Sequence, residues 1–98
     1  MSKIPIEPGR VVLSMAGRDA GRRFVVLGVD EAFAQLADGR LRKAEAPKKK
    51  KRRHMRPTQE FFPSIAEILK DGKLPSNAEL RRCLTDRPCR EERDIGQR

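Results

Sequence analysis

The chain lacks tryptophan and tyrosine, and its four phenylalanines are the only aromatic residues in a sequence of 98. No apolar stretch approaches the roughly 18 residues that a membrane-spanning helix needs, and no apolar signal-peptide segment follows the first residues. A chain of this length has room for one small domain with an extension. We therefore expect a cytoplasmic, non-enzymatic protein with no membrane contact and no deep pocket for a small-molecule substrate.

Cysteine and histidine are also scarce. Cys83 and Cys89 lie close together near the C-terminus, and the single histidine, His54, lies far from them. Zinc sites usually have four ligands in tighter, paired spacings, so we expect neither a metal ion nor another cofactor. No serine, cysteine or carboxylate is spaced to make His54 a catalytic base. Cys83 is expected to be a small apolar residue on a helix.

Positive charge is abundant and unevenly placed. Charged residues make up 38% of the chain, and the formal net charge is +9. Residues 1–39 and 59–98 each contain equal numbers of basic and acidic residues, so the whole excess lies in residues 40–58. Glu45 is the only acidic residue in that window. Charge concentrated in this way is typical of a site for a polyanion.

The N-terminal half alternates short apolar runs with glycines. Arg10–Met15 and Phe24–Val29 are rich in β-branched residues and predict strands, and we interpret Glu31–Leu36 as a third strand. Asp38-Gly39 is typical of a tight turn, which predicts a hairpin ending in a strand over Leu41–Ala44. Strands at this spacing indicate a small closed or nearly closed barrel.

The basic run Lys48–Arg53 contains six consecutive cations, which repel one another and disfavour regular structure. We expect this segment to be a solvated loop or a mobile arm until a partner neutralises it. His54-Met55 is then expected to form a short closing strand, with Met55 inside the barrel. Phe24 and Phe33 are expected in the core, which leaves no aromatic platform for stacking bases.

Two short helices are predicted after the barrel. Ser64 and Glu67 have the spacing of a capping box, in which the two residues satisfy each other's backbone donors at a helix start. Ser76 and Glu79 repeat this pattern before a second helix. That helix is expected to end before Pro88, because proline lacks the backbone donor that a helix interior needs.

Two glycines four residues apart, Gly17 and Gly21, lie between the first two predicted strands. Because glycine tolerates tight turns, this loop is expected to hold Arg18, Asp19 and Arg22 rigidly. Arginine forks bind phosphate oxygens bidentately, so a rigid arginine loop beside the basic run suits phosphate binding. The plainer alternative is a tight turn whose arginines are solvated and pair with Asp19.

The strand–Gly-x-x-x-Gly–strand pattern of this loop resembles the KOW motif of several ribosomal proteins and transcription elongation factors. Over roughly residues 9–84, the chain also resembles short bacterial KOW-domain RNA-binding proteins. These proteins are related to KOW-type large-subunit ribosomal proteins. The further segments that carry it, in the same order, are Asp38-Gly39, Leu41–Lys43, the basic run, His54-Met55 and Gly72–Arg82.

The resemblance implies an SH3-like barrel that binds structured RNA, with ribosomal RNA of the large subunit as the first candidate. It also implies a ribosome-associated protein, with a ribosomal protein or translation factor as a further partner. Gly17, Asp19 and Gly21 would form the structural part of the KOW loop. The candidate RNA-binding residues are Arg18, Arg22, Arg23, Arg40, Arg42, Lys43, Lys48, Lys49, Lys50, Lys51, Arg52, Arg53, His54 and Arg56.

The expected fold class is mainly β, with a small SH3-like (KOW) β-barrel followed by two short C-terminal α-helices. Residues 1–8 would be an N-terminal extension, and residues 9–58 would form the barrel with the basic run 47–53. Residues 59–84 would be a helical appendage. Residues 85–98 are polar and aperiodic and are expected to form a flexible, disordered tail.

Other interpretations of the same residues stay open. The helical segment is charge-neutral, so it could instead dock a protein in a transcription or translation complex. A DNA-associated basic protein would show a similar charge pattern. Pro47–Arg53 also matches a nuclear localisation signal, which would matter in a eukaryotic host.

Overall fold

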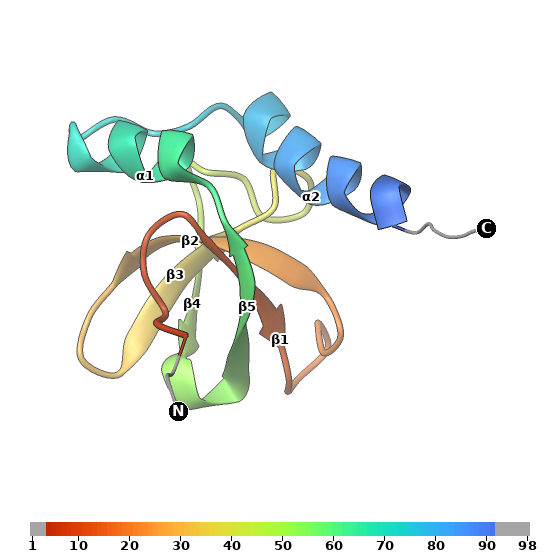
Figure 1. Ribbon diagram of the computed structural model, residues 1–98. Coiled ribbons are helices and arrows are strands. Elements are labelled where there is room, and N and C mark those ends of the chain that lie inside the picture. The colour runs from red at the N-terminus through yellow and green to blue at the C-terminus, as the bar shows by residue number, and fades with distance from the viewer. Residues whose placement is uncertain (1–3, 92–98) are drawn as a thin grey trace.

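The computed structural model describes the backbone of residues 4–91 and the side chains of residues 4–84. Over this range the chain is mainly β, as predicted, with five strands, a 3₁₀ helix and two α-helices (Figure 1). All strand pairs are antiparallel, and the order in the sheet is β4-β3-β2-β1-β5. The elements are β1 (Arg10–Ser14), β2 (Arg23–Val29), β3 (Phe33–Ala37), β4 (Lys48–Lys51), η1 (Arg52–His54), β5 (Met55–Phe61), α1 (Pro63–Lys70) and α2 (Asn77–Glu91).

The sheet is strongly curved but open. Leu36 of β3 and Met55 of β5 share a buried cluster with Val12 of β1, although two strands separate β3 from β5 in the sheet order. The pairing register shifts next to Gly28 in β2 and next to Arg10 in β1, and such bulges increase local twist. Among the described residues the hydrogen-bonded order ends at β4 and β5, so the expected closure into a barrel is not met.

The two helices cover the opposite face of the sheet. Ile65 of α1 and Leu80 of α2 are 1% and 0% exposed and pack in one cluster with Val11, Val25 and Leu27 of the sheet. Neighbouring apolar residues on a strand therefore point to opposite faces of the sheet. Val11 packs under the helices, and Val12 packs in the cluster on the concave face. The helical segment therefore contributes buried side chains to the core.

The predicted strand over Leu41–Ala44 is wrong, because this segment lies in a loop between β3 and β4. Asp38 Oδ1 accepts a hydrogen bond from the backbone N–H of Arg42 at 2.9 Å. Asn77 Oδ1 accepts one from the N–H of Ala44 at 2.8 Å. Side chains thus satisfy backbone donors that would otherwise need a neighbouring strand.

The basic run is not the loop or arm that charge repulsion predicted, because its lysines form the edge strand β4. Lys48 pairs with Leu36, and Lys51 pairs with Phe33 in β3. His54 lies in the 3₁₀ helix, and β5 begins only after it. Met55 is 6% exposed and lies in the core, as predicted, although its strand continues three residues beyond the predicted barrel boundary at residue 58.

Of the two predicted capping boxes, one is present. The N-cap of α1 is Phe62, and Pro63 lies in the first turn. Ser64 is therefore not the cap. A proline at this position already has the φ angle of a helix. At the second helix, Ser76 Oγ accepts from the N–H of Glu79, and the Glu79 carboxylate accepts from the N–H of Ser76, both at 3.0 Å. The second box is therefore confirmed.

α2 continues through Pro88 to Glu91, so the expected helix end before Pro88 is wrong. Proline cannot donate to the carbonyl four residues earlier, which is that of Leu84. The guanidinium of Arg23 donates to this carbonyl at 2.9 Å and so replaces the missing helical bond. Of the predicted disordered tail, residues 85–91 have a helical backbone, and residues 92–98 lie outside the described residues.

No helix in the described part of the chain is long and apolar enough to cross a bilayer.

Candidate nucleic-acid interface

The loop between β1 and β2 is closed by hydrogen bonds between its own ends. The N–H of Ser14 donates to the carbonyl of Arg22 at 2.9 Å, and the N–H of Gly21 donates to the carbonyl of Ser14 at 2.8 Å. Gly17 and Gly21 have φ angles of +84° and +88°, which side chains with a Cβ rarely adopt. The loop is thus tightly built, and it leaves Arg18 and Arg22 exposed.

Asp19 is the buried centre of this loop, with 8% of its surface exposed. Its carboxylate accepts a hydrogen bond from Ser14 Oγ at 2.8 Å and lies 2.9 Å and 3.3 Å from the ammonium groups of Lys48 and Lys50. Burial by itself raises the pKa of Asp19, but the bonds from Lys48, Ser14 and Lys50 outweigh it and hold the pKa far below its usual value. Asp19 therefore joins the loop to β4, whereas the plainer alternative paired it with its neighbouring arginines.

The lysines of β4 fall into two groups because a strand alternates its faces. Lys48 and Lys50 turn toward Asp19, and Lys50 also donates to the carbonyl of Ala16 at 2.8 Å. Lys49 and Lys51 are exposed. The Lys49 ammonium lies 4.9 Å from the centre of the Phe33 ring; Phe33 is half-buried, not fully in the core as expected.

The loop between β3 and β4 packs against the start of α2. A Cβ built on Gly39, whose φ is +79°, would lie 2.4 Å from the carbonyl oxygen of Asn77, so only glycine fits there. Arg81 Nη1 donates to the carbonyl of Gly39 at 2.7 Å. This packing fixes a loop whose next residues, Arg40, Leu41 and Arg42, are all exposed.

Two adjoining recesses lie where these two loops meet, and we call them together the cationic cleft. The first, of about 270 Å³, lies between the loops and β4, and the second, of about 260 Å³, reaches α2. They share Arg22 and Asp38 in their walls. The basic residues that line the cleft are Arg18, Arg22, Arg23, Arg40, Arg42, Lys48 and Arg81.

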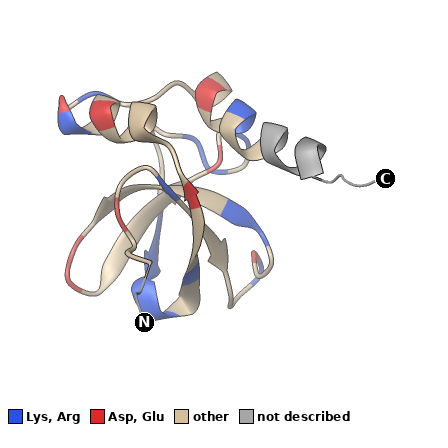
Figure 2. Cartoon of the chain, viewed as in Figure 1, with Lys and Arg blue, Asp and Glu red and all other residues tan. Residues whose placement is uncertain are grey.

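A further recess, of about 420 Å³, lies at the other end of β4 and is lined by Glu31, Ala32 and Lys51–Arg53. The guanidinium of Arg52 donates to the carbonyls of Asp30 and Glu31, so this side chain helps to hold the β2–β3 turn. Figure 2 shows the Lys and Arg positions at the start of β2, along β4 and in η1. The strand β4 therefore connects two basic regions, since Lys48 lines the cleft and Lys51 lines this recess.

The structure brings together only part of the predicted site. Arg18, Arg22, Arg23, Arg40, Arg42 and Lys48 meet in the cleft. Lys51, Arg52 and Arg53 lie at the far end of β4, while Lys49 and Lys50 occupy the middle of the strand. Lys43 and Arg56 are exposed outside these recesses, and His54 is half-buried.

Arg81 is the residue that sequence reasoning missed. It lies in the charge-neutral helical segment, which gave no reason to assign it to the basic site. The confirmed capping box is the signal that could have located it. The box fixes the start of α2 and the buried position of Leu80, and Arg81 is the next residue. Arg23, a candidate RNA-binding residue that lines the cleft, already has partners in the protein, because its guanidinium is bonded to Glu60 and to the carbonyl of Leu84. Burial lowers the pKa of Arg23, and we regard this side chain as mainly structural.

No protein-family model matches the chain, and no curated protein matches it. Within the described residues, no three His, Cys, Asp or Glu side chains gather where they could hold a metal ion.

Proposed function

We propose that this protein is a non-catalytic, KOW-type RNA-binding protein that holds structured RNA by its phosphate backbone. The observation that carries the proposal is the cationic cleft, in which basic side chains from two loops, β4 and α2 converge and the acidic ones, Asp19 and Asp38, are buried. Both carboxylates are engaged with the protein itself. The field at the mouth of the cleft is therefore set by exposed arginines, which suits a polyanion.

The arrangement favours phosphate contacts over the reading of base sequence. Arginines on fixed loops can bind phosphate oxygens bidentately, and the exposed lysines of β4 extend the charge along the strand. The resemblance to KOW proteins supports RNA over DNA and makes ribosomal RNA of the large subunit the first candidate. A ribosome-associated protein in the cytoplasm is the corresponding cellular setting.

The test compares charge removal inside and outside the cleft. The triple variant Arg18→Gln, Arg22→Gln, Arg42→Gln is matched to a control in which Lys70, Lys73 and Arg82, all exposed, are changed to Gln. Binding to a structured ribosomal RNA fragment and to a DNA duplex of equal length is measured across a salt series. The cleft variant is expected to lose about tenfold or more in RNA affinity and to show a salt slope smaller by about 2.

The control variant is expected to bind RNA as the wild type does. Equal losses in the two triple variants would mean that binding follows net charge alone, and the cleft would not be the site. Tighter binding to the DNA duplex than to RNA would favour the DNA-associated alternative. Co-sedimentation with the large ribosomal subunit that weakens as salt rises is expected for the ribosomal assignment, and migration only at the top of the gradient would contradict it.

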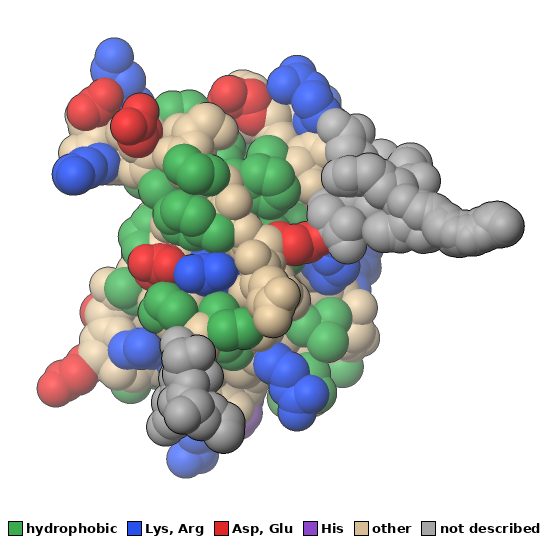
Figure 3. Space-filling view, viewed as in Figure 1, with side chains coloured by type: hydrophobic (Ala, Val, Ile, Leu, Met, Phe, Trp, Pro, Cys, Tyr) green, Lys and Arg blue, Asp and Glu red, His purple; other side chains and the backbone are tan. Residues whose placement is uncertain are grey.

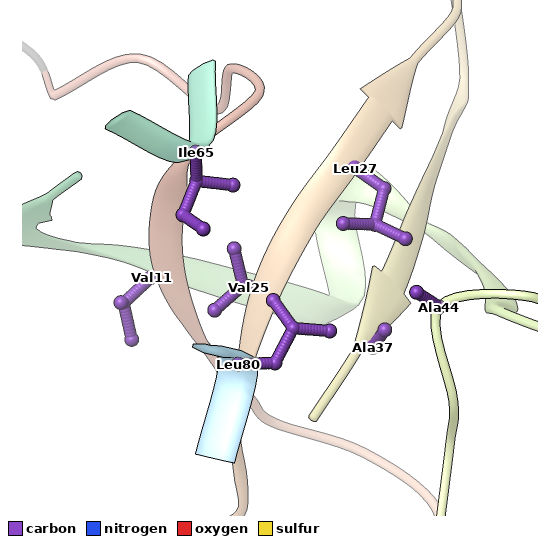
Figure 4. Close-up of a cluster of buried hydrophobic side chains, with 7 residues drawn as sticks. All are labelled: Val11, Val25, Leu27, Ala37, Ala44, Ile65 and Leu80. Carbon is purple, nitrogen blue, oxygen red and sulfur yellow. The ribbon is translucent and has the colours of Figure 1, made fainter. Parts of the chain in front are cut away.

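A second candidate function is protein docking on the helical side. A recess of about 370 Å³ lies there, lined by Glu7, Pro8, Leu27, Phe61, Ala66, Leu69 and Lys70. Figure 3 shows hydrophobic side chains gathered on the face that carries α1 and β5. Because the helices complete the core around Ile65 and Leu80 (Figure 4), deleting residues 59–98 would not test this function. The exposed Phe61 is the better target: Phe61→Ser should weaken a protein contact and leave RNA affinity unchanged.

A further inference from the structure

The first recess of the cationic cleft has a composition that phosphate binding alone does not require. Its walls carry Arg18, Arg22 and Arg42, but two apolar residues, Phe24 and Leu41, also line it. Its volume of about 270 Å³ lies just below the roughly 300–1,000 Å³ typical of small-molecule sites. A paired RNA helix cannot enter a space of this size, whereas a single nucleotide can.

Leu41 is held in an exposed position by a hydrogen-bonded turn. Asp38 Oδ1 accepts hydrogen bonds from the backbone N–H groups of Arg40 and Arg42, each at 2.9 Å. The N–H groups of Asp38 and Gly39 both donate to the carbonyl of Arg42, at 2.8 Å and 3.0 Å. Leu41 nevertheless leaves 68% of its surface exposed. The fold therefore presents an apolar side chain between two arginines, at the mouth of a basic recess.

We propose that this recess receives one unpaired nucleotide of the bound RNA. The base would lie against Leu41, with the Arg42 guanidinium available to stack on its face, and Arg18 and Arg22 would hold the adjoining phosphate. An unpaired nucleotide joins an apolar, stackable base to an anionic phosphate, and the recess offers surfaces for both. The inference rests on the proposed function and adds that the preferred RNA carries a bulge or a splayed base.

The site also revises the expectation that no stacking surface exists. That expectation depended on aromatic residues, of which Phe24 is 2% exposed. Bases also stack on arginine planes and on apolar side chains. Leu41 and Arg42 supply such a surface without an exposed aromatic ring.

The test uses three RNA hairpins of one stem sequence: one fully paired, one with a single bulged adenosine, and one with an abasic bulge at the same place. Their affinities for the wild-type protein, Leu41→Ser and Leu74→Ser are measured by fluorescence anisotropy at fixed salt. Leu74 is the matched control, because it is also exposed, at 55%, but lies in the connection between α1 and α2. Thermal melts verify that both variants fold.

The wild type and Leu74→Ser are expected to bind the bulged hairpin about tenfold more tightly than the other two. Leu41→Ser is expected to lose this preference and to keep its affinity for the paired stem. Equal, salt-dependent binding of all three hairpins by the wild type would overturn the nucleotide recess and leave the proposed function standing. Absence of salt-sensitive binding to any hairpin would overturn both. A preference for the bulge that survives Leu41→Ser would also contradict this site.

Discussion

Asp19 connects two segments that the sequence presents as separate, the glycine loop and the basic run. Its carboxylate faces the ammonium groups of Lys48 and Lys50 and the hydroxyl of Ser14. A buried carboxylate with these partners stays ionised. Its negative charge in turn reduces the repulsion between the lysine ammonium groups along β4. One acidic residue thus offsets the charge of two of the four consecutive lysines in this strand.

Asp19→Asn is expected to lower the free energy of unfolding by about 1–3 kcal/mol, since it leaves two part-buried ammonium groups without their counter-charge. The measurement is urea unfolding at neutral pH. Asp30→Asn is the control, because Asp30 is exposed and its loss should cost much less. Equal stabilities of the two variants would contradict the role of Asp19.

The pH dependence of stability follows from the same carboxylate. The pKa of Asp19 is lower in the folded protein than in the unfolded chain, so the unfolded state takes up the proton first as the pH falls. The contribution of Asp19 is therefore complete above about pH 5 and is lost progressively below about pH 4. Urea unfolding from pH 7 to pH 2 should show a steeper acid loss in the wild type than in Asp19→Asn. Parallel curves would show that other groups dominate.

Gly39 and Gly21 provide a matched pair of glycines with positive φ. Both would be strained by a Cβ, but an added methyl at Gly39 would also meet the carbonyl of Asn77, while at Gly21 it would meet nothing within 4 Å. Gly21→Ala is expected to cost about 1 kcal/mol, as a left-handed alanine does. Gly39→Ala should cost clearly more and should separate the loop from α2. Thermal unfolding of both variants tests this difference.

At the scale of elements, β4 places lysines that contact Asp19 and exposed lysines at alternate positions, and we propose that the exposed ones bind RNA. Changing Lys49 and Lys51 to Gln should reduce RNA affinity and the salt slope while leaving the melting temperature nearly unchanged, because both side chains are exposed. Changing Lys48 and Lys50 to Gln should lower the melting temperature, because these lysines bind Asp19. Anisotropy and thermal melts of the two double variants separate the effects. A loss of stability in the first pair would contradict this division.

α2 depends on a partner outside its own sequence. Pro88 removes the donor for the carbonyl of Leu84, and Arg23 of β2 supplies a replacement. A helix that contains a proline without such a partner usually kinks or ends there. The continuation of α2 past Leu84 is thus tied to the sheet, by a contact between residues 61 positions apart.

At the scale of the whole molecule, the helices and the sheet share one cluster of buried residues. Leu80 is fully buried in the cluster with Val11 and Val25 (Figure 4). Leu80→Ala should therefore lower the free energy of unfolding by about 2–4 kcal/mol. Chemical denaturation of this variant and of the wild type measures the loss. A Leu80→Ala protein as stable as the wild type would mean that the helices are a separate appendage after all.

Much of the strand and helix pattern could be predicted from local sequence. β-branched runs located β1 and β2, and the Ser76–Glu79 spacing located the start of α2, because these signals depend on neighbours in the chain. The candidate site was predicted only in part. The loop arginines and Lys48 do meet in one cleft, but Arg81 joins them from a segment whose balanced charge gave no signal.

The sequence by itself determined where charge accumulates, which segments become the first strands and where the second helix starts. Tertiary structure alone decided that the lysine run becomes an edge strand, that Leu41–Ala44 stays a loop and that α2 continues past Pro88. In each case the deciding partner is distant in the chain: Asp19 for the lysines, Asn77 for the loop and Arg23 for the helix. Local propensities describe a segment's own preferences, whereas these three outcomes depend on donors and acceptors that only folding brings within reach.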